Sequence, residues 1–135
     1  MNRESWVVFL LRFAAIALMF AFGAVFLPIS WMQWTHEGLG MGPFPDVPLV
    51  EYLTRSIALL YGFHGVLNLL ASFDIHRYRL FVKFSAWVNI VHGIGMFVID
   101  LKAGMPWYWT VAEGPPIAVL GLLLLLLLRG IPERR

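Results

Sequence analysis

The chain contains no cysteine among its 135 residues. Disulfide bridges, thiolate metal sites, iron–sulfur clusters and thiol catalysis are therefore excluded. Charged residues are also scarce, at 13% of the chain, whereas soluble domains have about a quarter. Because 60% of the residues are hydrophobic, we predict an integral membrane protein, with residues 1–135 forming one domain.

The sequence also lacks the common catalytic signatures, namely a nucleophile elbow, a P-loop, a dinucleotide fingerprint and an HExxH motif. Enzymatic activity is therefore left uncertain, with a non-enzyme favoured. The net charge of +2 is too small to indicate a nucleic-acid partner. The basic segment Asp74–Arg79 fits a topogenic loop that meets anionic lipid.

Four apolar runs are long enough to cross a bilayer, which takes about 20 helical residues. They cover residues 6–27, 50–73, 80–101 and 107–128. We therefore predict an all-α, four-transmembrane-helix antiparallel bundle. The fourth run crosses only if it includes Gly114-Pro115-Pro116, where we expect a kink because proline removes a helix donor.

The basic residues predict the orientation of these spans. With four spans both termini lie on one side, together with eight basic residues: Arg3, Arg12, Arg77, Arg79, Lys83, Arg129, Arg134 and Arg135. Lys102 lies on the other side, and Arg55 lies within a span. This positive-inside bias predicts a multi-pass protein with cytoplasmic N- and C-termini. The long first loop, residues 29–49, is then outside.

Polar and small residues follow one face of the second and third spans. These faces hold Glu51, Arg55, Ala58, Tyr61, Gly62, His64, Gly65 and Asn68 in the second span, and Ser85, Asn89, His92, Gly93, Met96 and Asp100 in the third. The opposite faces are bulky and apolar. Because membrane helices turn polar and small residues toward the protein interior, we expect both faces to point inward.

A count of residues from each turn predicts their depth. A turn centred near Tyr78 places three pairs at equal depth: His64 with His92, Asn68 with Asn89, and Arg55 with Asp100. A turn centred near Pro106 puts Glu113 level with Ile99, and Glu51 lies one turn further out. We therefore expect one arginine among three carboxylates in the outer half of the bundle, above two histidines.

Two functions are compatible with this cluster. Arg55 could clamp the helices by bridging to Asp100, Glu51 or Glu113. The cluster could instead line an outward-facing cavity for a small, partly apolar ligand, such as a quinone. The candidate ligand-binding residues are then Glu51, Arg55, Tyr61, His64, His92, Asp100 and Glu113. The alternative to a binding protein is a structural or accessory subunit of a larger membrane complex, or a homo-oligomer.

The two intramembrane histidines allow three interpretations: hydrogen bonds between helices, proton transfer or ligand binding, and ligation of a metal or haem b. No cofactor or metal is predicted, and His64 and His92 are the candidates if one binds. Glycines beside them would leave room for a macrocycle: Gly62, Gly65, Gly93 and Gly95. His36 and His76 are expected to be solvated in loops.

Several segments together resemble a known group of proteins. They are Glu51–Ser56, Asp74–Arg79 and Asp100–Pro106, with Trp109 and Glu113–Pro115. The chain is similar to small bacterial four-span proteins of unknown function, of the BphX-like and DoxX-like kind. The resemblance implies a four-span fold in the bacterial inner membrane and implies no activity.

Overall fold

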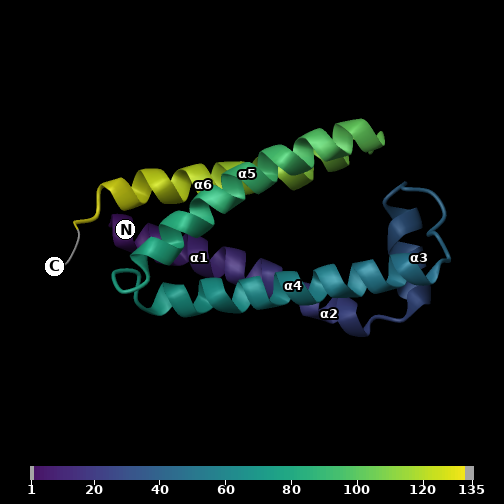
Figure 1. The fold of residues 1–135 in the computed structure, drawn as a ribbon, viewed down its shortest axis with the longest axis horizontal. Helices are drawn as coiled ribbons and strands as arrows, with labels where there is room; N and C mark the ends of the chain where they lie inside the picture. The colour runs from purple at the N-terminus through teal and green to yellow at the C-terminus, as the bar shows by residue number, and fades with distance from the viewer. Residues whose placement is uncertain (1, 133–135) are drawn as a thin grey trace. The chain divides into compact units, whose positions relative to one another are not determined.

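The computed structural model describes residues 2–132, a part of the chain that is helical and contains no strand. Its six helices follow one another as α1 (Arg3–Met19), α2 (Ala21–Phe26), α3 (Ile29–Gly38), α4 (Pro48–Phe73), α5 (Arg79–Ala103) and α6 (Trp107–Arg129) (Figure 1). The all-α fold predicted from the sequence is confirmed.

Within these residues, four helical segments are long and apolar enough to cross a membrane. They are α1 with α2 (Arg3–Phe26), α4, α5 and α6, and their bounds agree with the predicted spans to within three residues. The chain therefore fits a multi-pass integral membrane protein. Helix α6 continues through Pro115 and Pro116, so the last span includes this segment as the sequence required.

The first loop contains a helix, α3, that its composition did not predict. Pro28 has no N–H to continue α2, so the chain extends at Leu27 (ψ 135°) and starts α3 at Ile29. His36 lies in the last turn of α3, where its Nδ1 is 2.9 Å from the Gly42 carbonyl oxygen. His36 therefore lies in a helix within the predicted first loop, and its contact with Gly42 is exposed.

The chain divides into two compact units. We call residues 2–12 and 70–132 the terminal unit, and residues 13–69 the central unit. The terminal unit contains α5 and α6, and the central unit contains α2, α3 and most of α4.

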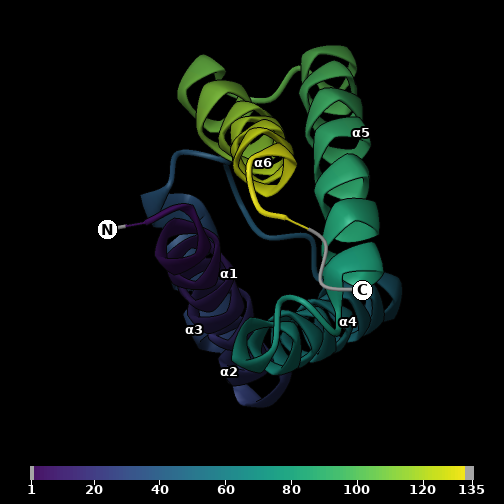
Figure 2. The same cartoon turned by 90° about the vertical axis from the view of Figure 1, so that its left-hand side faces the viewer.

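In the terminal unit, α5 and α6 run side by side as an antiparallel hairpin (Figures 1 and 2). Gly104 adopts a left-handed conformation (φ 69°) that ends α5 and lets the chain reverse. Near the middle of the hairpin, a Cβ on Gly93 would meet the backbone of Gly114, and a Cβ on Gly114 would meet that of Gly93. Two glycines therefore let the helices approach at backbone contact.

A hydrophobic core closes the other end of the terminal unit, where the first turns of α1 meet the last turns of α4 and α6 and the start of α5. Its buried residues are Val7, Leu11, Ala71, Ile75, Val82, Ala86, Leu124, Leu128 and Ile131. The Arg79 guanidinium also lies here and donates to the Leu128 carbonyl oxygen at 2.7 Å. The same oxygen accepts the Ile131 N–H at 3.2 Å, so a cation adds a second hydrogen bond at the C-terminal end of α6.

In the central unit, α1 and α2 pack against α4 in the antiparallel sense. A Cβ on Gly65 would meet the Ala15 carbonyl oxygen and Met19, and a Cβ on Gly62 would meet the Phe22 ring. The small residues on α4 therefore allow α1 and α2 to pack closely against it.

The predicted inward and outward faces of α4 and α5 are confirmed. On the inward faces Asn68, Ser85 and Asp100 are buried, at 2–3% exposure. On the outward faces Leu60 and Val91 are 67% and 68% exposed. This distribution suits helices whose apolar faces meet lipid.

Candidate functional site

Asp100 lies in the last turn of α5, on the face that packs against α6. That face is marked by Ala86, Ile90, Gly93 and Phe97, whose atoms contact the α6 glycines, and Asp100 continues the same three-and-four spacing. Its side chain is 3% exposed. The buried Oδ2 atom has no hydrogen-bond partner among the described residues.

Glu113 on α6 faces the same region. It is half-buried, accepts a hydrogen bond from the Trp109 side chain one turn earlier, and interacts electrostatically with Asp100 and His92. Two carboxylates and an imidazole from two helices therefore share one electrostatic environment. We call His92, Asp100, Trp109, Thr110 and Glu113 the acid cluster.

Thr110 completes the acid cluster from α6. It is 3% exposed and lies one turn before Gly114, on the side that packs against α5. Its hydroxyl donates to the Pro106 carbonyl oxygen at 3.4 Å. Further along α6, Pro115 and Pro116 each lack the N–H that would bind a carbonyl four residues earlier, at Val111 and Ala112.

The depth count for this hairpin is confirmed to within about one helical turn. It put Glu113 level with Ile99. In the structure the next residue, Gly114, packs against Gly93 and Phe97 of α5. The hairpin therefore brings Glu113 to Asp100, as the count required.

Arg55 has a different environment, in the central unit. Its Nε and Nη2 atoms each lie 2.9 Å from the Glu51 carboxylate. The guanidinium also donates to the carbonyl oxygens of Val25 and Leu27, the latter at 3.1 Å. These carbonyls lie where Pro28 ends α2, so Arg55 caps a helix C-terminus as well as pairing with Glu51.

Arg55 and the acids Asp100 and Glu113 belong to different units, so their pairing stays a prediction. The same holds for His64 with His92 and for Asn68 with Asn89. Tyr61 and His64 are half-buried on the inward face of α4.

The count behind these pairings placed the centre of the turn near Tyr78. In the structure Tyr78 is the residue before α5, and the loop of residues 74–78 is centred on His76. His76 is not a solvated loop residue as expected: both ring nitrogens are buried, and Nε2 lies 3.2 Å from a Glu4 carboxylate oxygen.

The room expected beside the glycines for a macrocycle is largely filled. Neighbouring helices occupy the space beside Gly62, Gly65 and Gly93, whereas the Cβ position of Gly95 is open. Among residues 2–132, no three His, Asp or Glu side chains converge as metal ligands would.

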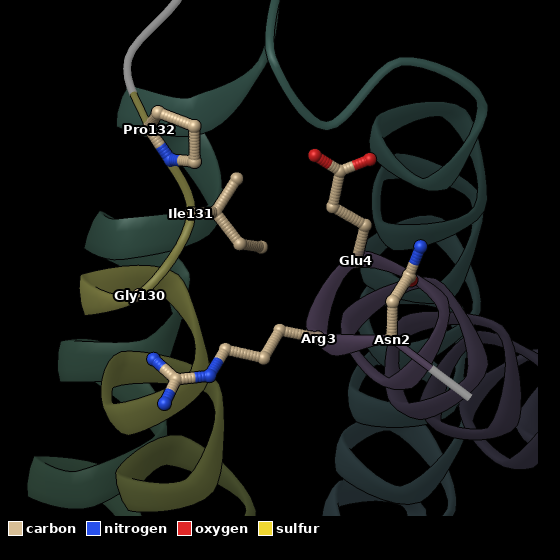
Figure 3. A pocket seen from close by; sticks show the side chains of 6 residues that line it. All are labelled: Asn2, Arg3, Glu4, Gly130, Ile131 and Pro132. Carbon is tan, nitrogen blue, oxygen red and sulfur yellow. The ribbon is translucent and has the colours of Figure 1, made fainter.

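An open pocket lies at the end of the terminal unit that carries the chain termini. It is lined by Asn2, Arg3, Glu4, Gly130, Ile131 and Pro132 (Figure 3). Figure 3 shows the Arg3 side chain extending toward Gly130 at the end of α6, whereas the Glu4 carboxylate points away from Gly130. None of the seven candidate ligand-binding residues lines this pocket.

Two members of the acid cluster were missed in the sequence. Trp109 was interpreted as one of several aromatics at the membrane boundary, although its spacing of four from Glu113 allowed a helical side-chain bond. Thr110 carried no signal of its own, and its role becomes visible only from the register of the hairpin.

Comparison with models of protein families, with curated proteins and with solved structures finds no match. The function therefore has to be inferred from the chemistry of the site. That chemistry is a buried carboxylate without a donor, a second carboxylate beside it, and an imidazole, all on two membrane-spanning helices.

Proposed function

We propose that this chain is an integral membrane protein that binds a small, partly apolar ligand at the acid cluster. The observation that carries the proposal is the buried Asp100 Oδ2 atom without a hydrogen-bond donor. A buried polar group left unsatisfied costs about 1–3 kcal/mol, and more when it is charged. A ligand that donates a hydrogen bond to this atom would remove that penalty, and its binding would therefore be favoured.

The position of the cluster supports entry from the membrane–water boundary. Trp107 and Tyr108 start α6 and are 78% and 41% exposed, as is typical of aromatics at that boundary. Exposed apolar side chains of the same hairpin, including Ile99 and Val111, offer a surface for the apolar part of the ligand.

Each residue of the cluster then has a role. Asp100 accepts the ligand's donor, Glu113 supplies the second acceptor, and Trp109 orients Glu113. His92 lies deeper along α5 and forms the floor. Arg55 and Glu51, which the sequence offered as ligand residues, we assign to helix capping because their polar atoms serve each other and α2.

The structural-subunit alternative is favoured by that same capping role. If the acids also serve only helix assembly, an apolar replacement of Asp100 should destabilise the fold or its assembly with partners. A ligand-binding protein with this replacement would fold and lose its ligand.

Native mass spectrometry of the protein in lipid nanodiscs tests the proposal. Wild type is compared with the Asp100→Asn/Glu113→Gln double variant, and with Glu37→Gln, which changes an exposed carboxylate on α3. We expect a bound small molecule on wild type and Glu37→Gln and none on the double variant. An identical bound mass on all three, or none on wild type, would contradict the proposal.

We further propose the bacterial inner-membrane location, the BphX-like or DoxX-like affinity and the cytoplasmic termini. The absence of cysteine makes the orientation easy to test, because one introduced thiol is the only one present. Gly38→Cys should react with an impermeant maleimide added outside intact cells, and Arg77→Cys should not. The opposite labelling would overturn the topology.

A further inference from the structure

Building on the proposed function, we infer that the acid cluster selects a protonated amine carried on an apolar chain. The carboxylates of Asp100 and Glu113 come from facing helices and lie close enough to interact. Asp100 is buried, and its Oδ2 atom lacks a donor. Anionic and carbonyl ligands offer acceptors, and the cluster already has more acceptors than donors.

The charge balance within the acid cluster favours a cation. Ionised carboxylates only accept hydrogen bonds, and Glu113 and Asp100 lie close enough to interact electrostatically. Lys102 is the nearest basic residue in sequence to Asp100, but two helical steps turn it to the other side of α5, where it is exposed. Apart from the His92 imidazole, no member of the acid cluster can carry a positive charge, so a cationic ligand would balance the pair of acids.

The other groups of the cluster also suit an ammonium group. An ammonium has three donors, which matches the acceptors of Asp100, Glu113 and the Thr110 hydroxyl of the acid cluster. The Trp109 ring and the exposed rings of Trp107 and Tyr108 can attract a cation through their faces. The described residues offer no three-ligand set for a bare metal ion.

The packing of the hairpin explains why the ligand needs an apolar chain. Gly93 and Gly114 close the space between α5 and α6 below the acids. An apolar chain therefore cannot enter between the helices and must lie along their exposed apolar surface, which carries Ile99 and Val111. In a bilayer, that surface is in contact with lipid.

Three probes of equal chain length test the inference: dodecylamine, dodecanol and dodecyl phosphate. Each is added to the full chain in phosphatidylcholine nanodiscs, and bound probe is counted by native mass spectrometry. We expect dodecylamine to bind wild type and Glu37→Gln with at least tenfold higher affinity than Asp100→Asn or Glu113→Gln. Circular dichroism confirms that each variant is folded, and two acid variants guard against one failing to fold.

The remaining outcomes separate the two proposals. If dodecanol binds better than dodecylamine with the same dependence on Asp100, the amine inference is wrong and the proposed function stands. If dodecyl phosphate binds best and Arg55→Gln abolishes it, Arg55 is the anchor and the amine inference is wrong. If no probe binds, or all bind Asp100→Asn as well as wild type, both proposals fail.

Discussion

Arg55 in the central unit and Asp100 in the terminal unit are both charged residues within membrane-spanning helices, yet their surroundings differ. Arg55 donates to the Glu51 carboxylate and to two carbonyl oxygens at the end of α2. Asp100 is 3% exposed, and its Oδ2 atom receives no hydrogen bond from the described residues. Arg55 is explained by the fold because its partners are present, whereas the buried Asp100 oxygen without a donor is the basis of the proposed ligand site.

The α5–α6 hairpin positions Asp100, and we expect the largest loss of stability from a substitution in the packing of this hairpin. Gly114→Val places a branched side chain where the Gly93 backbone already lies. Overpacking of this kind costs about 1–3 kcal/mol or more, so we expect the folded fraction to fall sharply in thermal melts followed by circular dichroism.

Gly95→Val is the matched control for that variant, because nothing lies within 4 Å of its Cβ position. It should melt close to wild type, since a side chain there meets open space. Equal losses in both variants would show that the helix disfavours valine at either position and that backbone contact is not the cause.

Arg55→Leu tests how much Arg55 contributes to the stability of the central unit. It removes the donors that cap α2 and pair with Glu51, and hydrogen bonds to charged groups contribute about 1.5–3 kcal/mol each when buried. Because Arg55 and Glu51 are 28% and 38% exposed, we expect a total loss of about 1–3 kcal/mol in denaturant titrations. Arg55→Lys should recover only part of it, because lysine lacks the planar fork.

Dodecylamine binding separates the two roles in this same variant. If Arg55 is structural, folded Arg55→Leu protein should bind the amine as wild type does. Loss of amine binding from well-folded Arg55→Leu would place Arg55 in the ligand site together with the acid cluster.

Asp100→Leu should change the stability less than Arg55→Leu does, and in the opposite direction. It replaces a buried acceptor without a donor by an apolar side chain of the same branched shape but larger volume. Because overpacking offsets part of the gain, we expect stability to change by no more than about 1 kcal/mol, toward greater stability. Ligand binding should be lost. A loss of stability of several kcal/mol in the same thermal melt would show that Asp100 has a structural partner, as the clamp interpretation requires.

The sequence was sufficient for the features that depend on period and length. The spans follow from apolar runs, the inward faces of α4 and α5 from spacings of three and four, and the meeting of Glu113 with Asp100 from a short turn. It was not sufficient where a contact joins distant segments. The role of Arg55 depends on where Pro28 ends α2, and nothing near Arg55 in the sequence shows which carbonyls will face it.

The burial of His76 has the same origin. A histidine between Asp74 and Arg77 reads as a solvated loop residue, because local composition gives no sign that the start of α1 will pack on that loop. Ile75 is buried in the core beside it, and this anchors the loop against α1 and brings His76 to Glu4.

The contact between His76 and Glu4 should have the smallest effect on stability. The pair is partly exposed and lies beside a core that is already packed without it. The Glu4 side chain is 42% exposed, and such pairs contribute about 0.2–1 kcal/mol. We expect Glu4→Gln to lower the free energy of unfolding by no more than that, against the exposed control Glu37→Gln, in paired denaturant titrations. A loss above about 2 kcal/mol would mean that the buried His76 ring depends on this carboxylate. Glu4 would then join Arg79 as a charged side chain that stabilises the fold of the terminal unit.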